Sequence, residues 1–198
     1  MRDPDGFNSR TPPQNEGRYY TNMKILLSAH IDLARPVMSI KMDDKNLLGL
    51  VDNLAGVFTA YQTSRKTGVP VEYTNFEELE FDGAEAVARS LDKDTLVIVV
   101  DVTTESTNGK EGYIGNLYGI DIKELKEKFE NRIRIREDYF EPTEDETIIY
   151  GKKFGLMTFY YGLAIKPKYH DPDNSITLED IDNASNVLTD LVKWYKTK

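Results

Sequence analysis

The stretch TLVIVV at residues 95–100 is the clearest candidate for a buried strand in this chain. A second run of the same kind, MKILLSA at residues 23–29, is apolar over the length of a strand and ends in polar residues. Uninterrupted apolar runs of this length are typical of strands buried on both faces, as in a parallel sheet. The two runs therefore predict the centre of a mostly parallel sheet.

Helical patterns alternate with strand-length runs along the rest of the chain. The predicted helices span residues 52–65, 83–91, 122–129, 144–154 and 178–195, and the further predicted strands span residues 37–42, 71–76, 112–118, 132–136 and 156–165. Strands that alternate with helices form βαβ units, in which helices cover both faces of the sheet. We therefore predict an α/β fold, a three-layer α/β/α sandwich with a mostly parallel mixed sheet.

Two of the predicted helices carry start signals. Asp52 is a suitable N-cap for the helix over residues 52–65, and Thr177 with Asp180 forms a capping-box pattern ahead of residues 178–195. The apolar stripe of the first helix consists of Leu54, Val57, Phe58 and Tyr61 at the i, i+3, i+4 and i+7 positions. Such a stripe is expected to face the core.

The length and the start of the chain suggest its domain organisation. At roughly 150 residues per domain, 198 residues correspond to one domain. Residues 1–22 lack apolar periodicity and include three prolines. We predict an irregular N-terminal arm over residues 1–22 and a single domain over residues 23–198.

Charge and composition exclude several classes of function. The chain has 25 Lys and Arg against 34 Asp and Glu, a net charge of −9, and no basic block that could neutralise nucleic-acid phosphates. The absence of cysteine excludes disulfides, thiolate metal sites and cysteine nucleophiles. No apolar run approaches the ~18 residues of a membrane span, and residues 1–22 lack the apolar core of a secretory signal. We expect a cytoplasmic protein that binds neither nucleic acid nor membrane.

Polar residues of one chemical kind follow the predicted strands or begin the next helix. They are His30, Asp32, Asp52, Glu77, Glu78, Asp101 and His170. This set includes both histidines of the chain. Because ligands of open α/β sheets bind beyond the carboxyl ends of the strands, we expect these side chains to converge at one edge of the sheet.

Two imidazoles with several carboxylates and no thiolate suit Zn²⁺, Mn²⁺ or Co²⁺. Two ions fit better than one, because a dinuclear hydrolase needs an imidazole and a terminal carboxylate per ion, a shared carboxylate, and a further carboxylate as base. That set is supplied by His30, Asp52, Glu77, Glu78, Asp101 and His170. Asp32 is left to hold the second nitrogen of His30 or to brace its loop.

Five sequence blocks carry a resemblance to a known group of enzymes. They are SAHID (28–32), DNLAG (52–56), FEELEFDGA (76–84), VVDVT (99–103) and PKYHDP (167–172). In order and placement they resemble the co-catalytic zinc aminopeptidases, the clan of dinuclear metallopeptidases that includes families M28, M42 and M20. The resemblance implies two Zn²⁺ ions per chain, with Co²⁺ or Mn²⁺ as alternatives, and a peptide or N-acyl amino acid as substrate.

The resemblance also implies a role for each metal ligand. His30 and Asp101 would bind opposite ions, and Asp52 would bridge the pair. Glu78 would complete the site of one ion and His170 the site of the other.

The remaining catalytic role falls to Glu77, again by resemblance. Glu77 would be the general base, taking a proton from the metal-bridging water and passing it to the leaving amine. In such enzymes the peptide bond after the bridging aspartate is often cis, so we expect a cis bond between Asp52 and Asn53.

Only 52 − 30 = 22 residues separate His30 from Asp52. This interval is too short for the inserted lid or dimerisation domain that family M42 carries there, so the resemblance is to a compact form. Relatives often assemble, and a homo-oligomer is therefore a candidate state.

Other polar and aromatic residues are interpreted as structural. Glu144, Asp145 and Glu146 resemble a segment of the relatives only loosely, and we interpret them as the charged start of a helix. We expect Tyr160 and Tyr161 to serve strand packing and not substrate contact.

The sequence favours a metal-dependent hydrolase that acts as an aminopeptidase, and two alternatives stay open. A deacylase or carboxypeptidase of the same clan would share the metal site and differ in its pocket. A noncatalytic binding module derived from a peptidase is the second alternative, although such a module would be expected to lose a histidine or the base.

Overall fold

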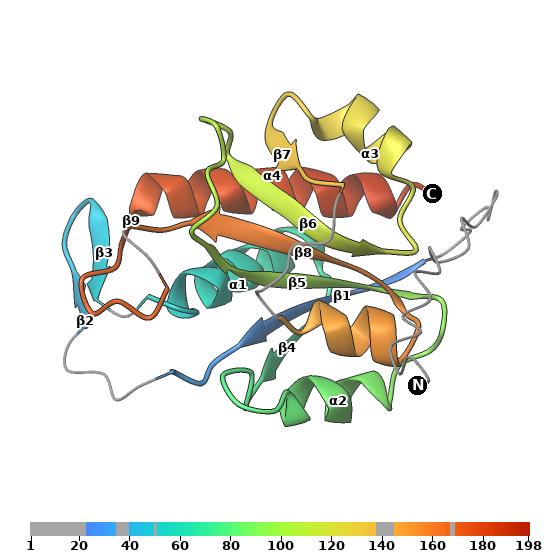
Figure 1. Ribbon diagram of the computed structural model, residues 1–198. Coiled ribbons are helices and arrows are strands. Elements are labelled where there is room, and N and C mark those ends of the chain that lie inside the picture. Colours follow the sequence, from blue (N-terminus) through green and yellow to red (C-terminus); the bar gives the residue numbers. More distant parts are fainter. Residues whose placement is uncertain (1–22, 35–39, 50, 138–144, 167–168) are drawn as a thin grey trace, which may run out of the picture.

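The computed structural model describes residues 23–34, 40–49, 51–137, 145–166 and 169–198. Its centre is a six-stranded sheet with the order β4-β1-β5-β8-β6-β7 (Figure 1). The strands are β1 (Lys24–His30), β4 (Val71–Thr74), β5 (Thr95–Thr103), β6 (Gly112–Tyr118), β7 (Ile133–Ile135) and β8 (Met157–Ala164). The strands β4, β1, β5 and β8 are parallel, whereas β6 pairs antiparallel with β8 and parallel with β7. The predicted mostly parallel mixed sheet is confirmed.

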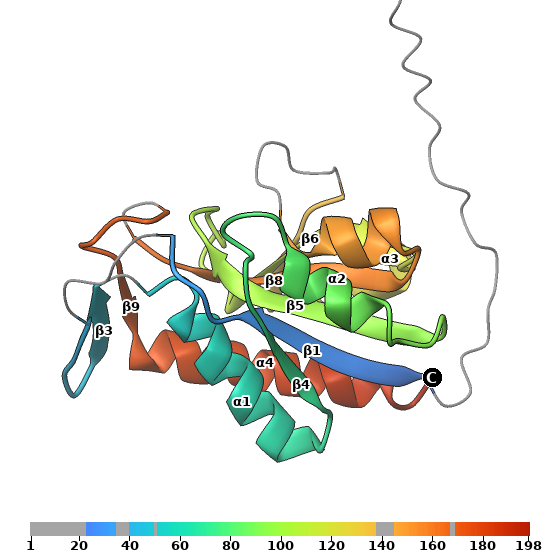
Figure 2. The same cartoon turned by 90° about the horizontal axis from the view of Figure 1, so that it is seen from below.

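Helices cover both faces of this sheet. Their bounds are α1 (Leu54–Thr67), α2 (Asp82–Ala88), α3 (Ile122–Phe129), α4 (Leu178–Tyr195) and a π-helix, η1 (Ile148–Lys153). Figure 2 shows α1 and α4 on one side of the sheet and α2 on the other. Buried residues of α1, α3 and α4 share one apolar cluster, and those of α2 and η1 share a second. The predicted α/β/α sandwich is therefore confirmed.

Strand β5 supplies both halves of the core. Every residue from Thr95 to Thr103 is buried. Because side chains alternate between the faces of a strand, Leu96, Ile98 and Val100 join the cluster of α1 and α4, whereas Val97 and Val99 join the cluster of α2 and η1. An uninterrupted apolar run is what a strand in this position requires.

Helix α1 differs from its prediction in start and in buried face. The N-cap is Asn53, whose side chain accepts a hydrogen bond from the Gly56 backbone N–H at 3.0 Å, and it is not Asp52. Phe58 and Tyr61 of the predicted stripe are 38% and 53% exposed. Leu54 and Val57 of the stripe are partly buried and pack against the core, as predicted. The fully buried residues of the helix are Ala55, Gly56, Thr59, Ala60 and Thr63.

Close packing explains why small residues form that face. A Cβ atom on Gly56 would lie 2.7 Å from the carbonyl oxygen of Val100 in β5. Helix α1 also packs along α4, which further limits the room for large side chains. Large aromatic residues are therefore placed on its outer surface, against the rule that an apolar stripe faces the core.

A second, small sheet was not predicted as such. It contains β2 (Ile40–Met42), β3 (Asn46–Gly49) and β9 (Ser175–Thr177) in the order β2-β3-β9. Of the strand predicted over residues 37–42, residues 40–42 are observed, and residues 37–39 lie outside the described residues. The cap of α4 is as predicted, since Thr177 Oγ1 accepts a hydrogen bond from the backbone N–H of Asp180 at 2.9 Å.

Two further predictions concern segments at the margins of the described residues. The helix predicted over residues 144–154 is observed as the short π-helix η1, and residue 144 lies outside the described part. The arm predicted over residues 1–22 also lies outside it and stays a prediction. Within the described ranges, no helix combines the length and the apolar character needed to cross a bilayer.

Truncation of the core strand should cost much of the stability. Leu96 is fully buried in β5, and we expect Leu96→Ala to lower the free energy of unfolding by about 2–5 kcal/mol, because it removes apolar contacts and leaves a cavity. Leu79→Ala is the matched control, since Leu79 is 73% exposed, and should change stability by less than ~0.5 kcal/mol. Urea denaturation followed by circular dichroism measures both; equal effects would contradict the assigned core.

Candidate functional site

The predicted site residues come from the carboxyl ends of adjacent parallel strands and the segments that follow them. His30 is the last residue of β1, and Asp101 lies in the neighbouring strand β5. Strand β5 continues to Thr103, so Asp101 lies inside this strand and does not follow it as predicted. His30 and Asp101 are on the sheet face covered by α2 and η1, because they share strand parity with Leu26 and Val99.

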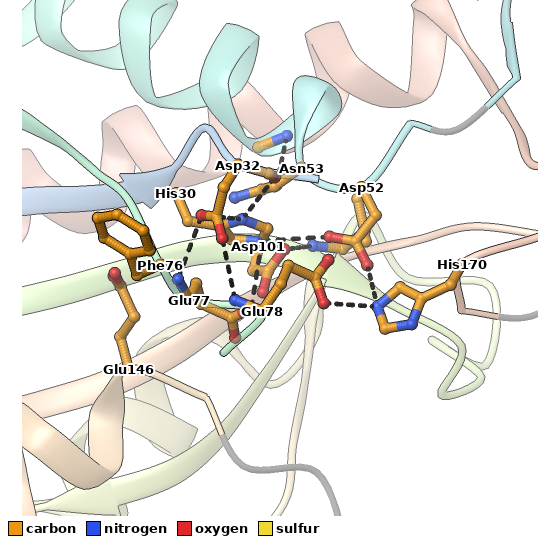
Figure 3. A network of polar contacts seen from close by, with 12 residues as sticks. His30, Asp32, Asp52, Asn53, Phe76, Glu77, Glu78, Asp101, Glu146 and His170 are labelled. Atoms are coloured by element: carbon orange, nitrogen blue, oxygen red, sulfur yellow. Dashed lines mark hydrogen bonds and ion pairs between the residues drawn. The ribbon is translucent and has the colours of Figure 1, made fainter. Parts of the chain in front are cut away.

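The other predicted ligands approach from connecting segments. Asp52 directly precedes the cap of α1, Glu77 and Glu78 lie in the turn between β4 and α2, and His170 lies between β8 and β9. Figure 3 shows their side chains pointing toward one another. The structure thus brings together all seven residues that the sequence singles out.

His30 is the centre of the first half of this cluster. Its Nε2 atom lies 3.2 Å from Asp52 Oδ1, 3.4 Å from Asp101 Oδ1 and 3.9 Å from Glu77 Oε2. The His30 side chain is only 2% exposed. A buried imidazole nitrogen therefore faces three carboxylates at once.

His170 is the centre of the second half. Its Nε2 atom lies 3.1 Å from Glu78 Oε2 and 3.4 Å from Asp52 Oδ2. Asp52 consequently faces His30 with one carboxylate oxygen and His170 with the other. A carboxylate shared between two histidine groups has the arrangement expected of a bridging ligand.

The grouping of the side chains corrects one expectation. The resemblance implied that His30 and Asp101 bind opposite ions, but the structure places them in one group with Asp52, and places Glu78 and His170 together in a second group with Asp52. The cause is topological. β1 and β5 are adjacent, so the side chains at their ends meet, whereas Glu78 and His170 both come from connecting segments.

Asp32 performs both of the tasks that the sequence left open for it. The Nδ1 atom of His30 lies 3.2 Å from the Asp32 carbonyl oxygen and 3.5 Å from Asp32 Oδ1. The two Asp32 carboxylate oxygens also accept hydrogen bonds from the backbone N–H groups of Glu77 at 3.2 Å and Glu78 at 3.1 Å. Burial opposes ionisation of Asp32, but the contact with His30 and these hydrogen bonds lower its pKa.

The connection from Asp52 to the sheet is fixed by its neighbour. The peptide bond between Asp52 and Asn53 is cis, as expected from the resemblance. The Asn53 side chain donates a hydrogen bond from Nδ2 to the carbonyl oxygen of Val100 at 2.8 Å. Asp52 is thereby held next to the end of β5, where Asp101 lies.

The electrostatics of the cluster favour an added positive charge. Burial and the nearby carboxylate of Asp101 raise the pKa of Glu77 to about 10, and burial raises the pKa of Asp101. Burial alone would lower the pKa of His30, yet the surrounding carboxylates, Asp101 first, raise it overall. These three pKa shifts reflect an excess of negative charge in a buried place.

Unsatisfied buried atoms point to the same conclusion. His30 Nε2 and Asp52 Oδ1 are buried and form no hydrogen bond with the residues that the structure describes. Three sets of side chains have ligand atoms within 4.8 Å of one another: His30–Asp52–Asp101, His30–Glu77–Glu78 and Asp52–Glu78–His170. A divalent cation with nitrogen and oxygen ligands fits these donors and would compensate the charge.

Sequence reasoning misplaced two acidic residues. Asp145 and Glu146 directly precede η1, as the charged start of a helix would, but they are buried, at 4% and 1% exposed. Glu146 accepts a hydrogen bond from Ser28 Oγ at 2.7 Å, and Asp145 accepts hydrogen bonds from Asn116 Nδ2 at 2.5 Å and from the Thr147 backbone N–H at 2.7 Å. The loose resemblance of this segment to the relatives was the available signal, because a run of three acids is otherwise typical of a surface.

A cavity of about 330 Å³ opens beside the cluster. Besides predicted site residues it is lined by Leu79, Phe81, Thr103, Glu105, Tyr113, Asn116, Asp145, Tyr160 and Tyr169. Tyr160 therefore lines the cavity in addition to packing in β8, which sequence analysis did not anticipate. Tyr161 packs in the opposite core, where its hydroxyl donates to the Ala184 carbonyl oxygen at 2.9 Å.

No family model and no curated protein matches the sequence. Solved structures similar to it include the TET1 peptidase of Pyrococcus horikoshii (TM-score 0.60, 15% identity, 77% of this chain and 52% of that one). Aminopeptidase APDkam598 from Desulfurococcus kamchatkensis matches with a TM-score of 0.54, 18% identity, and 77% and 50% of the two chains. The TET aminopeptidase of a marine-sediment archaeon of the Thaumarchaeota matches with a TM-score of 0.58 and 15% identity, over 80% of this chain and 52% of that one.

The chain has the fold of these aminopeptidases. The predicted resemblance to the clan is thus confirmed at the level of the fold. This chain spans about half the length of each of these three structures.

Buried Glu146 should make stability depend on pH. Burial raises the pKa of Glu146 from 4.5 to about 7, so the folded protein binds its proton more tightly than the unfolded chain. This contribution is complete below about pH 4.5 and is lost as the pH rises through about 7. Glu146→Gln cannot ionise, so we expect its stability relative to the natural protein to increase by ~1–3 kcal/mol between pH 5 and 8.5.

Thermal unfolding in the presence of a chelator, at a series of pH values, measures this difference. Glu127→Gln is the control, because it is the same substitution at a position exposed on α3. A stability difference for Glu146→Gln that does not change with pH would contradict the prediction.

Proposed function

We propose that this protein is a metal-dependent hydrolase of the peptidase type and, more specifically, an aminopeptidase. The observation that carries the proposal is the position of Asp52, whose two carboxylate oxygens lie 3.2 Å from His30 Nε2 and 3.4 Å from His170 Nε2. One carboxylate between two histidine groups is the donor arrangement of a two-metal hydrolase. The aminopeptidase folds of the similar structures support the peptide as the substrate class.

In this proposal two divalent cations, with Zn²⁺ as first choice, are held by five side chains. His30, Asp101 and one oxygen of Asp52 would hold one ion, and Glu78, His170 and the other oxygen of Asp52 would hold the second. When bound, such ions polarise the scissile carbonyl group and favour deprotonation of water at neutral pH.

Glu77 has the position of a general base in this proposal. Its carboxylate lies beside His30, with 3.9 Å between Glu77 Oε2 and His30 Nε2, and it lines the cavity. Glu77 would take a proton from the attacking water and deliver it to the leaving amine. Asp32 keeps Glu77 in place, because it accepts the hydrogen bond from the Glu77 backbone N–H.

A homo-oligomer is part of the proposal. The TET1 peptidase of Pyrococcus horikoshii is described as assembling into a tetrahedron or a large octahedral shell. A cytoplasmic location stays a prediction from the sequence.

Metal binding is the first test. The purified protein, stripped with chelator and reloaded with Zn²⁺, should bind about two equivalents. His170→Ala should bind about one, because the second group loses its imidazole, whereas Asp52→Ala should weaken both sites. Plasma mass spectrometry after gel filtration measures these stoichiometries, and fewer than about two equivalents in the natural protein would contradict the dinuclear proposal.

Loss of the base should separate catalysis from metal binding. Glu77→Gln should lower kcat for an aminoacyl p-nitroanilide by about 10²–10⁴-fold while metal content is unchanged, because the variant cannot accept a proton. Glu80→Gln is the matched control in the same turn, since Glu80 is exposed and absent from the cavity lining. Unchanged turnover in Glu77→Gln would remove Glu77 from this role.

Substrate panels distinguish the alternatives of the same clan. An aminopeptidase should cleave aminoacyl anilides with a free amine and spare their N-acetylated forms, whereas a deacylase should cleave N-acyl amino acids. Absence of hydrolysis across aminoacyl, N-acyl and longer peptide substrates, with two metal equivalents bound, would favour the noncatalytic binding module.

A further inference from the structure

The cavity extends beyond the proposed metal ligands to a second group of acidic side chains. Glu105 and Asp145 line it together with aromatic residues. Neither belongs to the sets of side chains that could hold a metal ion among the described residues. Their place in the wall of the cavity therefore calls for a separate explanation.

Glu105 is already compensated by positive charge. Its Oε2 atom lies 3.4 Å from Arg134 Nη1 and 3.8 Å from Arg136 Nη1. The Glu105 side chain is also 23% exposed, so water reduces the cost of its charge further. This carboxylate needs no ligand to balance it.

Asp145 has no such compensation. It is 4% exposed, and in the described part of the chain it forms no ion pair. Its oxygens accept hydrogen bonds from Asn116 Nδ2 and from the Thr147 backbone N–H, which fix the carboxylate in one orientation. Burial raises the pKa of Asp145 to about 6. A buried, oriented carboxylate without a counter-charge is a site for a cation.

Aromatic rings line the same cavity as Asp145 and the proposed metal ligands. Tyr160 and Tyr169 line the cavity with Phe81 and Tyr113. Tyr113 is 3% exposed, and the Arg134 guanidinium carbon lies 5.9 Å from the centre of its ring. Rings of this kind pack against an aliphatic chain and attract a cation over their faces.

We propose that this part of the cavity binds the side chain of the substrate residue at the cleaved bond, and that Asp145 recognises a primary ammonium group at the end of that side chain. The proposal rests on the proposed function in taking the ligand to be an aminoacyl group. A lysine-like residue meets the requirements, because its aliphatic stem contacts the aromatic rings and its ammonium reaches the carboxylate. Asp145 is then a specificity-determining residue and takes no part in the proton transfer.

Binding of compounds that cannot be hydrolysed tests this directly. L-Lysinol and L-norleucinol carry the same four-carbon side chain with and without a terminal ammonium, and neither contains an amide bond. Isothermal titration calorimetry with the Zn²⁺-loaded protein at pH 7.5 should show lysinol binding at least ~10-fold more tightly, which corresponds to about 1.4 kcal/mol. Equal affinities of the natural protein for the two compounds would overturn the proposal.

The variant Asp145→Asn removes the charge and keeps the shape. It should bring the two affinities within about twofold of each other, mainly by weakening lysinol binding. Asp94→Asn, the same substitution at an exposed position before β5, should retain the preference. Preserved selectivity in Asp145→Asn would refute the role of Asp145. Equal weakening of both compounds would refute it too, since Asp145 would then contact the α-ammonium group that they share.

The calorimetric comparison of lysinol and norleucinol does not depend on whether the protein hydrolyses a substrate. A protein that prefers lysinol but cleaves no substrate would retain the ligand site and lose the proposed aminopeptidase function. If Asp145→Asn does not fold, as judged by circular dichroism, the comparison of the two compounds in the natural protein still decides between support and refutation.

Discussion

The gathering of negative charge at the carboxyl end of the parallel strands is the constraint on which the rest of the structure depends. His30, Asp52 and Asp101 are 2%, 4% and 8% exposed, so water does little to screen them. Apolar core lies on both sides of the sheet and offers no compensation. Charge balance must therefore come from groups at this edge, and the backbone N–H groups of Glu77 and Glu78, which donate to the Asp32 carboxylate beside His30, are the part of it that the chain supplies.

The central sheet could be predicted from the sequence because its strands are buried on both faces and are therefore apolar. A parallel strand covered on both faces needs an uninterrupted apolar sequence, and residues 95–100 and 23–29 have one. The position of the candidate site follows from the same sheet, because the carboxyl ends of parallel strands lie at one edge and the residues that follow them meet there. For the apolar stripe of residues 52–65 the prediction is wrong only at Phe58 and Tyr61, because the close approach of Gly56 to Val100 determines which residues of α1 are buried most deeply.

The parts that sequence reasoning missed depend on three-dimensional neighbours. Asp145 and Glu146 are buried because Asn116 and Ser28, distant in sequence, donate hydrogen bonds to them. Nothing local in an acidic run reveals such partners. The pairing of His30 with Asp101 likewise depends on which strands are adjacent in the sheet, and the order of residues along the chain does not contain that information.

The small sheet connects the two histidine groups through the backbone. Strand β3 ends three residues before Asp52, strand β9 begins five residues after His170, and the two strands are hydrogen-bonded to each other. Gly49 N–H also donates to the Asn174 carbonyl oxygen at 2.9 Å. The spacing between the two halves of the cluster is therefore set by main-chain hydrogen bonds between segments that lie far apart in the sequence, such as Leu48 with Ser175. Such a scaffold prepares the geometry before any ion arrives and makes both halves respond together to a change in either segment.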